Sequence, residues 1–97
     1  MPRKPSKKAG SQSKRVLFSI SAPEAKAVSL AGGFNEWDTQ SLPMKRDPKG
    51  VWKVTLDLNP GRYEYRFLVD GVWRDDPSAK EKVDNPFGTH NSVRTVR

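Results

Sequence analysis

Two tryptophans at turn signals are the residues of this sequence whose chemistry is easiest to assign. Trp37 closes the segment GGFNEW, residues 32–37, and Trp73 closes VDGVW, residues 69–73, so both are expected on loops or loop edges. Indole rings give broad, rigid, largely apolar contact surfaces, each with one N–H donor. We therefore expect these two rings to bind a ligand or a partner rather than to take part in a reaction.

The other reactive side chains form no catalytic or metal-binding pattern. Asp75 and Asp76 are adjacent carboxylates, but a glycosidase pair needs both on one site, and neighbours in an extended segment point to opposite faces. Asp76 precedes Pro77 and is more simply a turn residue. His90 is the only histidine and cysteine is absent, so the usual zinc ligands are missing. We expect no enzymatic activity, no metal and no cofactor.

Length and composition narrow the class of protein. The 97 residues allow one small domain, well below the roughly 200 residues of the smallest barrel enzymes. No apolar run approaches the roughly 18 to 20 residues that span a bilayer, and no apolar signal segment follows the basic N-terminus. The absence of cysteine fits a reducing compartment. The sequence predicts a cytoplasmic, monomeric protein with no membrane partner.

The net charge of +7 is concentrated at the N-terminus. Residues 1–15 carry six basic side chains and no acidic one, whereas residues 16–97 carry twelve basic and eleven acidic ones. Residues 1–15 are also rich in Pro, Ser and Gly without apolar periodicity, which predicts a disordered basic tail. Such a tail can act as a solubilising leader, attract an anionic protein partner, or bind phosphate-bearing polymers in a salt-sensitive way. Nucleic acid is the least expected of these partners.

Residues 16–97 show the alternation of apolar and polar side chains that is typical of strands. The strands expected in this segment are residues 16–21, 27–32, a short piece within 42–46, 51–58, 63–69, a return strand that Trp73 begins, and 92–96. Trp52 alternates in phase with Leu58 and is assigned to the core. Asp70 and Gly71 are the pair that a two-residue type I′ hairpin turn needs, because both positions require positive φ.

Residues 75–88 contain two prolines and a charged middle, so we expect a long loop with at most one helical turn. About seven short strands without a convincing helix predict an all-β fold, an antiparallel β-sandwich of immunoglobulin-like kind. Residues 16–97 would form this domain, and residues 1–15 the tail.

Three separated motifs carry a family resemblance. GGFNEW, the hairpin YEYRFLVDGVWRDDP at residues 63–77 and NPFGTHNSV at residues 85–93 resemble carbohydrate-binding module family 48, and most closely the glycogen-binding domain of AMP-activated protein kinase β subunits. The likeness covers residues 16–96. It implies an early-set β-sandwich that binds glycogen, starch-type glucan or malto-oligosaccharide without catalysis, because the barrel that acts in isoamylases and branching enzymes is missing here.

The resemblance also implies a carbohydrate-binding site. Trp37 and Trp73 match the two aromatic residues that stack on sugar rings. Arg66 occupies the position of a lysine that contacts sugar hydroxyls, and arginine offers a planar fork of donors in place of a point charge. Phe87 matches a leucine that enters the centre of the helical sugar chain, and is bulkier. The polar contacts of the family fall on Thr89 and Asn91.

The residues themselves agree with an open ledge of this kind. Strand alternation places Arg66 opposite Tyr65, so its guanidinium is expected in solvent and free to donate to hydroxyls. Thr89 and Asn91 share a parity and would lie on one side of an extended segment. Glu64 could instead pair with Arg66.

Other interpretations stay open at this stage. Asn91 could cap a turn by bonding to its own backbone, as we expect of Asn35. Trp37 or Trp73 could cover the end of the core. An early-set domain whose tryptophans form a hot spot for another protein is the main alternative function, because Trp and Arg are enriched in hot spots.

Overall fold

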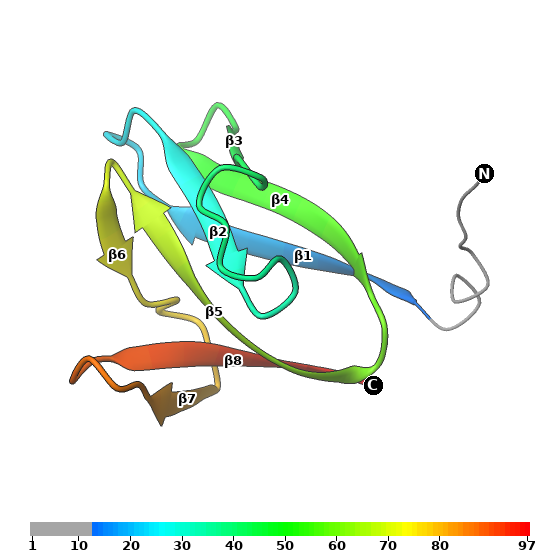
Figure 1. The fold of residues 1–97 in the computed structure, drawn as a ribbon. Coiled ribbons are helices and arrows are strands. Elements are labelled where there is room, and N and C mark those ends of the chain that lie inside the picture. The colour runs from blue at the N-terminus through cyan, green and yellow to red at the C-terminus, as the bar shows by residue number, and fades with distance from the viewer. Residues whose placement is uncertain (1–12) are drawn as a thin grey trace.

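The computed structural model describes residues 13–97, and these fold into two antiparallel β-sheets (Figure 1). This part of the chain contains no helix long and apolar enough to cross a membrane. The strands are β1 Lys14–Ser21, β2 Val28–Gly32, β3 Lys45–Arg46, β4 Val51–Leu58, β5 Gly61–Val69, β6 Val72–Arg74, β7 Glu81–Asp84 and β8 His90–Val96.

The two sheets differ in size, and one segment of the chain forms hydrogen bonds with a strand of each. The smaller sheet has the order β1-β4-β3, and the larger has the order β2-β5-β8-β7, with β6 also paired to β5. The segment 42–46 runs along both. The Leu42 carbonyl accepts from the Leu30 N–H of β2 at 3.0 Å, and Lys45 then pairs with Lys53 of β4. One side of the sandwich is therefore closed by backbone hydrogen bonds.

The core lies between the sheets and is rich in aromatic rings. Phe18 of β1 and Tyr65 of β5 are fully buried, and their ring centroids lie 4.9 Å apart at an edge-to-face angle. Trp52 is buried at 8 % exposure, and its indole N–H donates to the Ala22 carbonyl at 2.9 Å. The predicted β-sandwich and the assignment of Trp52 to the core are confirmed.

The structure corrects several predicted boundaries. Strand β5 begins at Gly61 rather than at residue 63, and β8 begins at His90 rather than at residue 92. The segment 75–88 is not a loop throughout, because β7, Glu81–Asp84, pairs with β8 at the edge of the larger sheet. The first strand begins at Lys14 rather than at residue 16. The prediction of a disordered tail otherwise falls on residues 1–12, which lie outside the described part of the chain.

The hairpin between β5 and β6 has the turn that its sequence predicts. Asp70 and Gly71 have φ values of 49° and 83°, as a type I′ turn requires. The Asp70 carboxylate also accepts hydrogen bonds from the backbone N–H groups of Ala27 and Lys26, and these bonds lower its pKa. This turn fixes the register that brings Trp73 opposite Leu68.

A buried hydrogen-bonded group joins β5, β8 and the turn after β6. The Tyr65 hydroxyl donates to Asp76 Oδ2 at 2.6 Å, and the Asp76 N–H donates to the Ser92 hydroxyl at 2.9 Å. Burial and the bond to Asp76 raise the pKa of Tyr65 well above its ordinary value. Asp76 also accepts from the backbone and hydroxyl of Ser78, so it is the expected turn residue and a buried anchor as well.

The turn after β2 presents Trp37 in an uncommon backbone conformation. Glu36 and Trp37 have φ values of 57° and 59°, which cost residues other than glycine free energy. Asn35 stabilises the turn as expected, since its Oδ1 accepts from the Gly32 N–H and its Nδ2 donates to the Asp38 carbonyl. A Cβ at Gly32 would lie 2.5 Å from the Glu64 carbonyl oxygen, so the chain needs glycine there.

We predict that Asp76→Ala lowers the free energy of unfolding by about 3 kcal/mol, because it leaves the buried Tyr65 hydroxyl without an acceptor. Urea denaturation measures this change. Asp57→Ala is the matched control, since Asp57 is exposed and only pairs with Arg15 at 3.6 Å, and it should cost less than about 1 kcal/mol. Equal losses in the two variants would refute the anchoring role of Asp76.

We predict that Asn35→Ala speeds hydrogen exchange at the Trp37 backbone N–H, which donates to the Gly32 carbonyl at 2.9 Å. Loss of the side-chain bonds that hold the turn should cost about 1 to 2 kcal/mol. Glu36→Gly is the contrasting variant, because glycine adopts positive φ without strain, and it should keep the Trp37 N–H protected. Unchanged exchange in Asn35→Ala would contradict this account.

Candidate functional site

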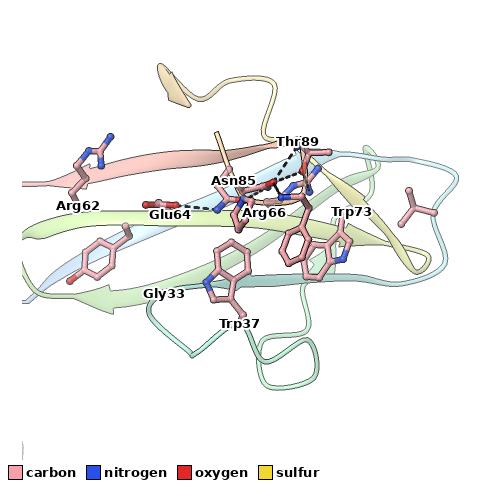
Figure 2. Close-up of a pocket in the computed structure, with 13 residues that line it drawn as sticks. Gly33, Trp37, Arg62, Glu64, Arg66, Trp73, Asn85 and Thr89 are labelled. Atoms are coloured by element: carbon pink, nitrogen blue, oxygen red, sulfur yellow. Dashed lines mark hydrogen bonds between the residues drawn. The ribbon is translucent and has the colours of Figure 1, made fainter. Parts of the chain in front are cut away.

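A groove with a volume of about 1170 Å³ runs over the outer face of the larger sheet. Its floor is β5, and its walls come from the turn after β2, from β6 and from the segment that leads into β8 (Figure 2). All six predicted binding residues line this one groove: Trp37, Arg66, Trp73, Phe87, Thr89 and Asn91. Residues from four separate segments therefore meet at one surface.

The aromatic side of the groove is built by Trp37 and Trp73. Their ring centroids lie 6.3 Å apart with an angle of 70° between the planes, and the residues are 36 % and 40 % exposed. The two rings thus form an angled, rigid apolar surface toward solvent. Neither ring belongs to the buried core cluster, so the interpretation of a core cover is not supported. Phe87 stands at the rim of the groove and is 87 % exposed.

Arg66 differs from its prediction. Its side chain is only 14 % exposed, and its Nη2 lies 3.1 Å from Asp75 Oδ1. Its Nη1 donates to the Thr89 hydroxyl at 3.3 Å. The prediction that the guanidinium is free in solvent was wrong, because Asp75, which directly follows β6, lies against it. Glu64 is therefore not its ion-pair partner.

The polar side of the groove is a connected set of hydrogen bonds. Asn85 accepts from the Thr89 hydroxyl at 3.0 Å and donates to Asn91 Oδ1 at 3.0 Å. Asn91 in turn donates to Glu64 Oε1 at 3.1 Å. Asn91 thus lies at the start of β8 with its amide between two side chains, rather than capping its own backbone, and it is only 9 % exposed.

The charges of the groove are largely compensated. Arg66 faces Asp75, and Arg62 forms an ion pair with Glu81 of β7. The bond to Glu81 raises the pKa of Arg62 above its ordinary value. A groove with paired charges, an aromatic wall and short polar side chains suits an uncharged polar ligand better than a polyanion.

The sequence did not indicate two residues that the structure places centrally. Asn85 lines the groove and its side chain bonds to three neighbours, and the Asn85–Pro86 turn signal could have pointed to it. Glu64 shares the strand parity of Arg66 and was considered only as a counter-ion. Among residues 13–97, no three His, Cys, Asp or Glu side chains gather in a way that could hold a metal ion.

Known proteins resemble this chain over most of its length. Residues 16–97 match the family model described as the glycogen recognition site of AMP-activated protein kinase. The chain is 37 % identical over 90 residues to the 5′-AMP-activated protein kinase subunit beta-1 of Sus scrofa, which covers 93 % of this chain and 70 % of that sequence.

Other relatives carry the same segment within longer proteins. Protein FLOURY ENDOSPERM 6, chloroplastic, of Oryza sativa subsp. japonica is 41 % identical over 82 residues, 84 % of this chain and 15 % of that protein. The 1,4-alpha-glucan branching enzyme GlgB of Aquifex aeolicus is 45 % identical over 66 residues, 64 % of this chain and 10 % of that enzyme. Together with the family match, these identities show that the chain belongs to the family of glycogen recognition sites of AMP-activated protein kinase.

Proposed function

We propose that this chain is a non-catalytic module that binds glycogen or related α-1,4-linked glucans in the groove over β5. The observation that carries the proposal is the pair of exposed indoles, Trp37 and Trp73, set at 70° beside a polar wall. A glucan helix presents apolar C–H faces between rims of hydroxyls. Two angled rings suit successive sugar faces of a curved chain, and the polar wall suits the hydroxyls.

Three features support a neutral saccharide over a charged polymer as the ligand. The two arginines of the groove, Arg62 and Arg66, are both paired with carboxylates. The acidic side chain of Glu64 lines the same groove, which opposes a phosphate backbone. The family to which the chain belongs is a glycogen recognition site.

An open groove of this kind should bind a short linear oligosaccharide modestly, with a Kd of roughly 10 μM to 1 mM. Its role would be to locate another activity on a glucan rather than to convert the glucan. The kinase subunit among its relatives favours a protein partner for this chain too, and the basic residues within 1–15 are the proposed handle. We propose as well that the protein is a monomer and that it is located in the cytoplasm.

A protein-binding hot spot at the same surface is the second candidate function. Exposed tryptophans next to a partly buried arginine are typical of such hot spots. A neutral sugar distinguishes the two functions, because a protein hot spot has no reason to respond to it. A third role, electrostatic binding of nucleic acid by residues 1–15, would disappear at about 500 mM salt, whereas binding to the groove would persist.

We predict that maltoheptaose changes the tryptophan fluorescence of the protein in a saturable way, and that Trp37→Ala and Trp73→Ala each weaken binding about ten-fold or more, because each removes a stacking surface. A cello-oligosaccharide should produce no change. Leu17→Ala is the matched control, since Leu17 is 50 % exposed on the other sheet, and its Kd should equal that of the wild type.

Circular dichroism should show that all three variants are folded, so that a loss of binding reports on the groove. A folded wild-type protein that gives no response up to about 10 mM maltoheptaose would refute glucan binding. The surface would then be examined as a protein-binding hot spot.

A further inference from the structure

The side chain of Asn85 is the centre of the polar wall, and both ends of its amide are engaged. Its Oδ1 accepts from the backbone N–H of Phe87 at 3.0 Å, from that of Thr89 at 3.2 Å, and from the Thr89 hydroxyl at 3.0 Å. Its Nδ2 donates to Asn91 Oδ1 at 3.0 Å. Three of the six predicted binding residues thus depend on one side chain that was not among them (Figure 2).

The two backbone groups fix the direction of this hydrogen-bond chain. A backbone N–H only donates, so the atom of Asn85 that faces Phe87 and Thr89 must be its oxygen, and the atom that faces Asn91 must be its nitrogen. Asn91 must therefore turn its own oxygen to Asn85 and its nitrogen to Glu64 Oε1, 3.1 Å away. A carboxylate at that end accepts, so both ends specify the same orientation.

The fixed direction decides what the wall can offer a ligand. The Thr89 hydroxyl hydrogen is used on Asn85, and one lone pair of its oxygen accepts from Arg66 Nη1 at 3.3 Å. A hydroxyl has two lone pairs, so Thr89 retains an acceptor. Asn91 uses its oxygen on Asn85 and one amide hydrogen on Glu64, so it retains a donor.

We propose that Asn85 is a positioning residue of the glucan site, which orients Thr89 as a hydrogen-bond acceptor and Asn91 as a donor toward sugar hydroxyls. This inference rests on the proposed function of the groove. Without Asn85, the Thr89 hydroxyl could rotate and the Asn91 amide would lose the partner of its oxygen. Asn85 would then influence specificity by selecting which hydroxyls of the glucan must donate and which must accept.

Asn85→Asp tests the proposal with a minimal change. Aspartate keeps an oxygen for the backbone groups of Phe87 and Thr89, but replaces the donor to Asn91 with a second oxygen. We expect an increase of about ten-fold in the Kd for maltoheptaose, which corresponds to the loss of one good hydrogen bond. Asn59→Asp adds the same charge at an exposed turn before β5, and should bind as the wild type does.

A double-mutant cycle with Asn91→Ala separates positioning from a general structural effect. If Asn85 acts through Asn91, Asn85→Asp should change the Kd by less than about two-fold in the Asn91→Ala background, because the shared interaction is already absent. Thermal unfolding of every variant gives the accompanying change in stability. An equal factor in both backgrounds would overturn the positioning role, since Asn85 would then act independently of Asn91.

The outcomes keep this inference distinct from the proposed function. Wild-type binding that Asn85→Asp leaves unchanged refutes the role of Asn85 and leaves glucan binding intact. Equal weakening by Asn59→Asp and Asn85→Asp assigns the effect to added charge, and refutes the role as well. A folded wild-type protein that does not bind maltoheptaose refutes glucan binding and, with it, this inference.

Discussion

The buried hydrogen bond between Tyr65 and Asp76 is the constraint on which the rest of the site depends. Tyr65 pairs with Ser92 across β5 and β8, and Asp76 bonds to both side chains, so three segments are held in one register beneath the groove. Adjacent residues in extended segments point to opposite faces. One chain neighbour of Tyr65 and one of Ser92, Arg66 and Asn91, therefore line the groove, and Asp75, which precedes Asp76, lies against Arg66. The hydrogen bonds that satisfy these buried polar groups therefore also set the positions of side chains in the groove.

Preorganisation follows from this arrangement. Arg66 is held by Asp75 and Thr89, and Asn91 is held by Asn85 and Glu64, so the polar side chains have lost most of their rotamer freedom before any ligand arrives. Ordering a flexible side chain at an interface costs about 0.5 to 1.5 kcal/mol. A groove whose side chains are already ordered avoids that cost. It can therefore bind with few contacts, at the expense of adapting poorly to ligands of other shapes.

Local sequence signals were sufficient for much of the fold. The alternation around Phe18 and Tyr65 predicted strands with the correct buried faces, and Asp70–Gly71 predicted its turn, because these features depend on near neighbours. The features that the sequence did not predict depend on residues that are distant along the chain. Strand β7 is short and charged, and exists because β8 offers it an edge. Arg66 is largely buried because the pairing of β6 with β5 brings Asp75 against its guanidinium.

The candidate site was predicted in a similarly uneven way. The six residues that the resemblance indicated do meet in one groove. The Asn85–Pro86 turn signal indicates a turn, but the central place of Asn85 was missed because the turn signal predicts only a bond to the nearby backbone. The additional bonds of Asn85 to the Thr89 hydroxyl and to Asn91 depend on how the turn packs against the start of β8. The exposed rims of the groove, including Phe87 at 87 % exposure, have a further consequence. A chain molecule lying along such a groove needs no free end, so any internal stretch can enter. The number of equivalent registers then grows with polymer length, and each doubling adds roughly 0.4 kcal/mol of statistical free energy.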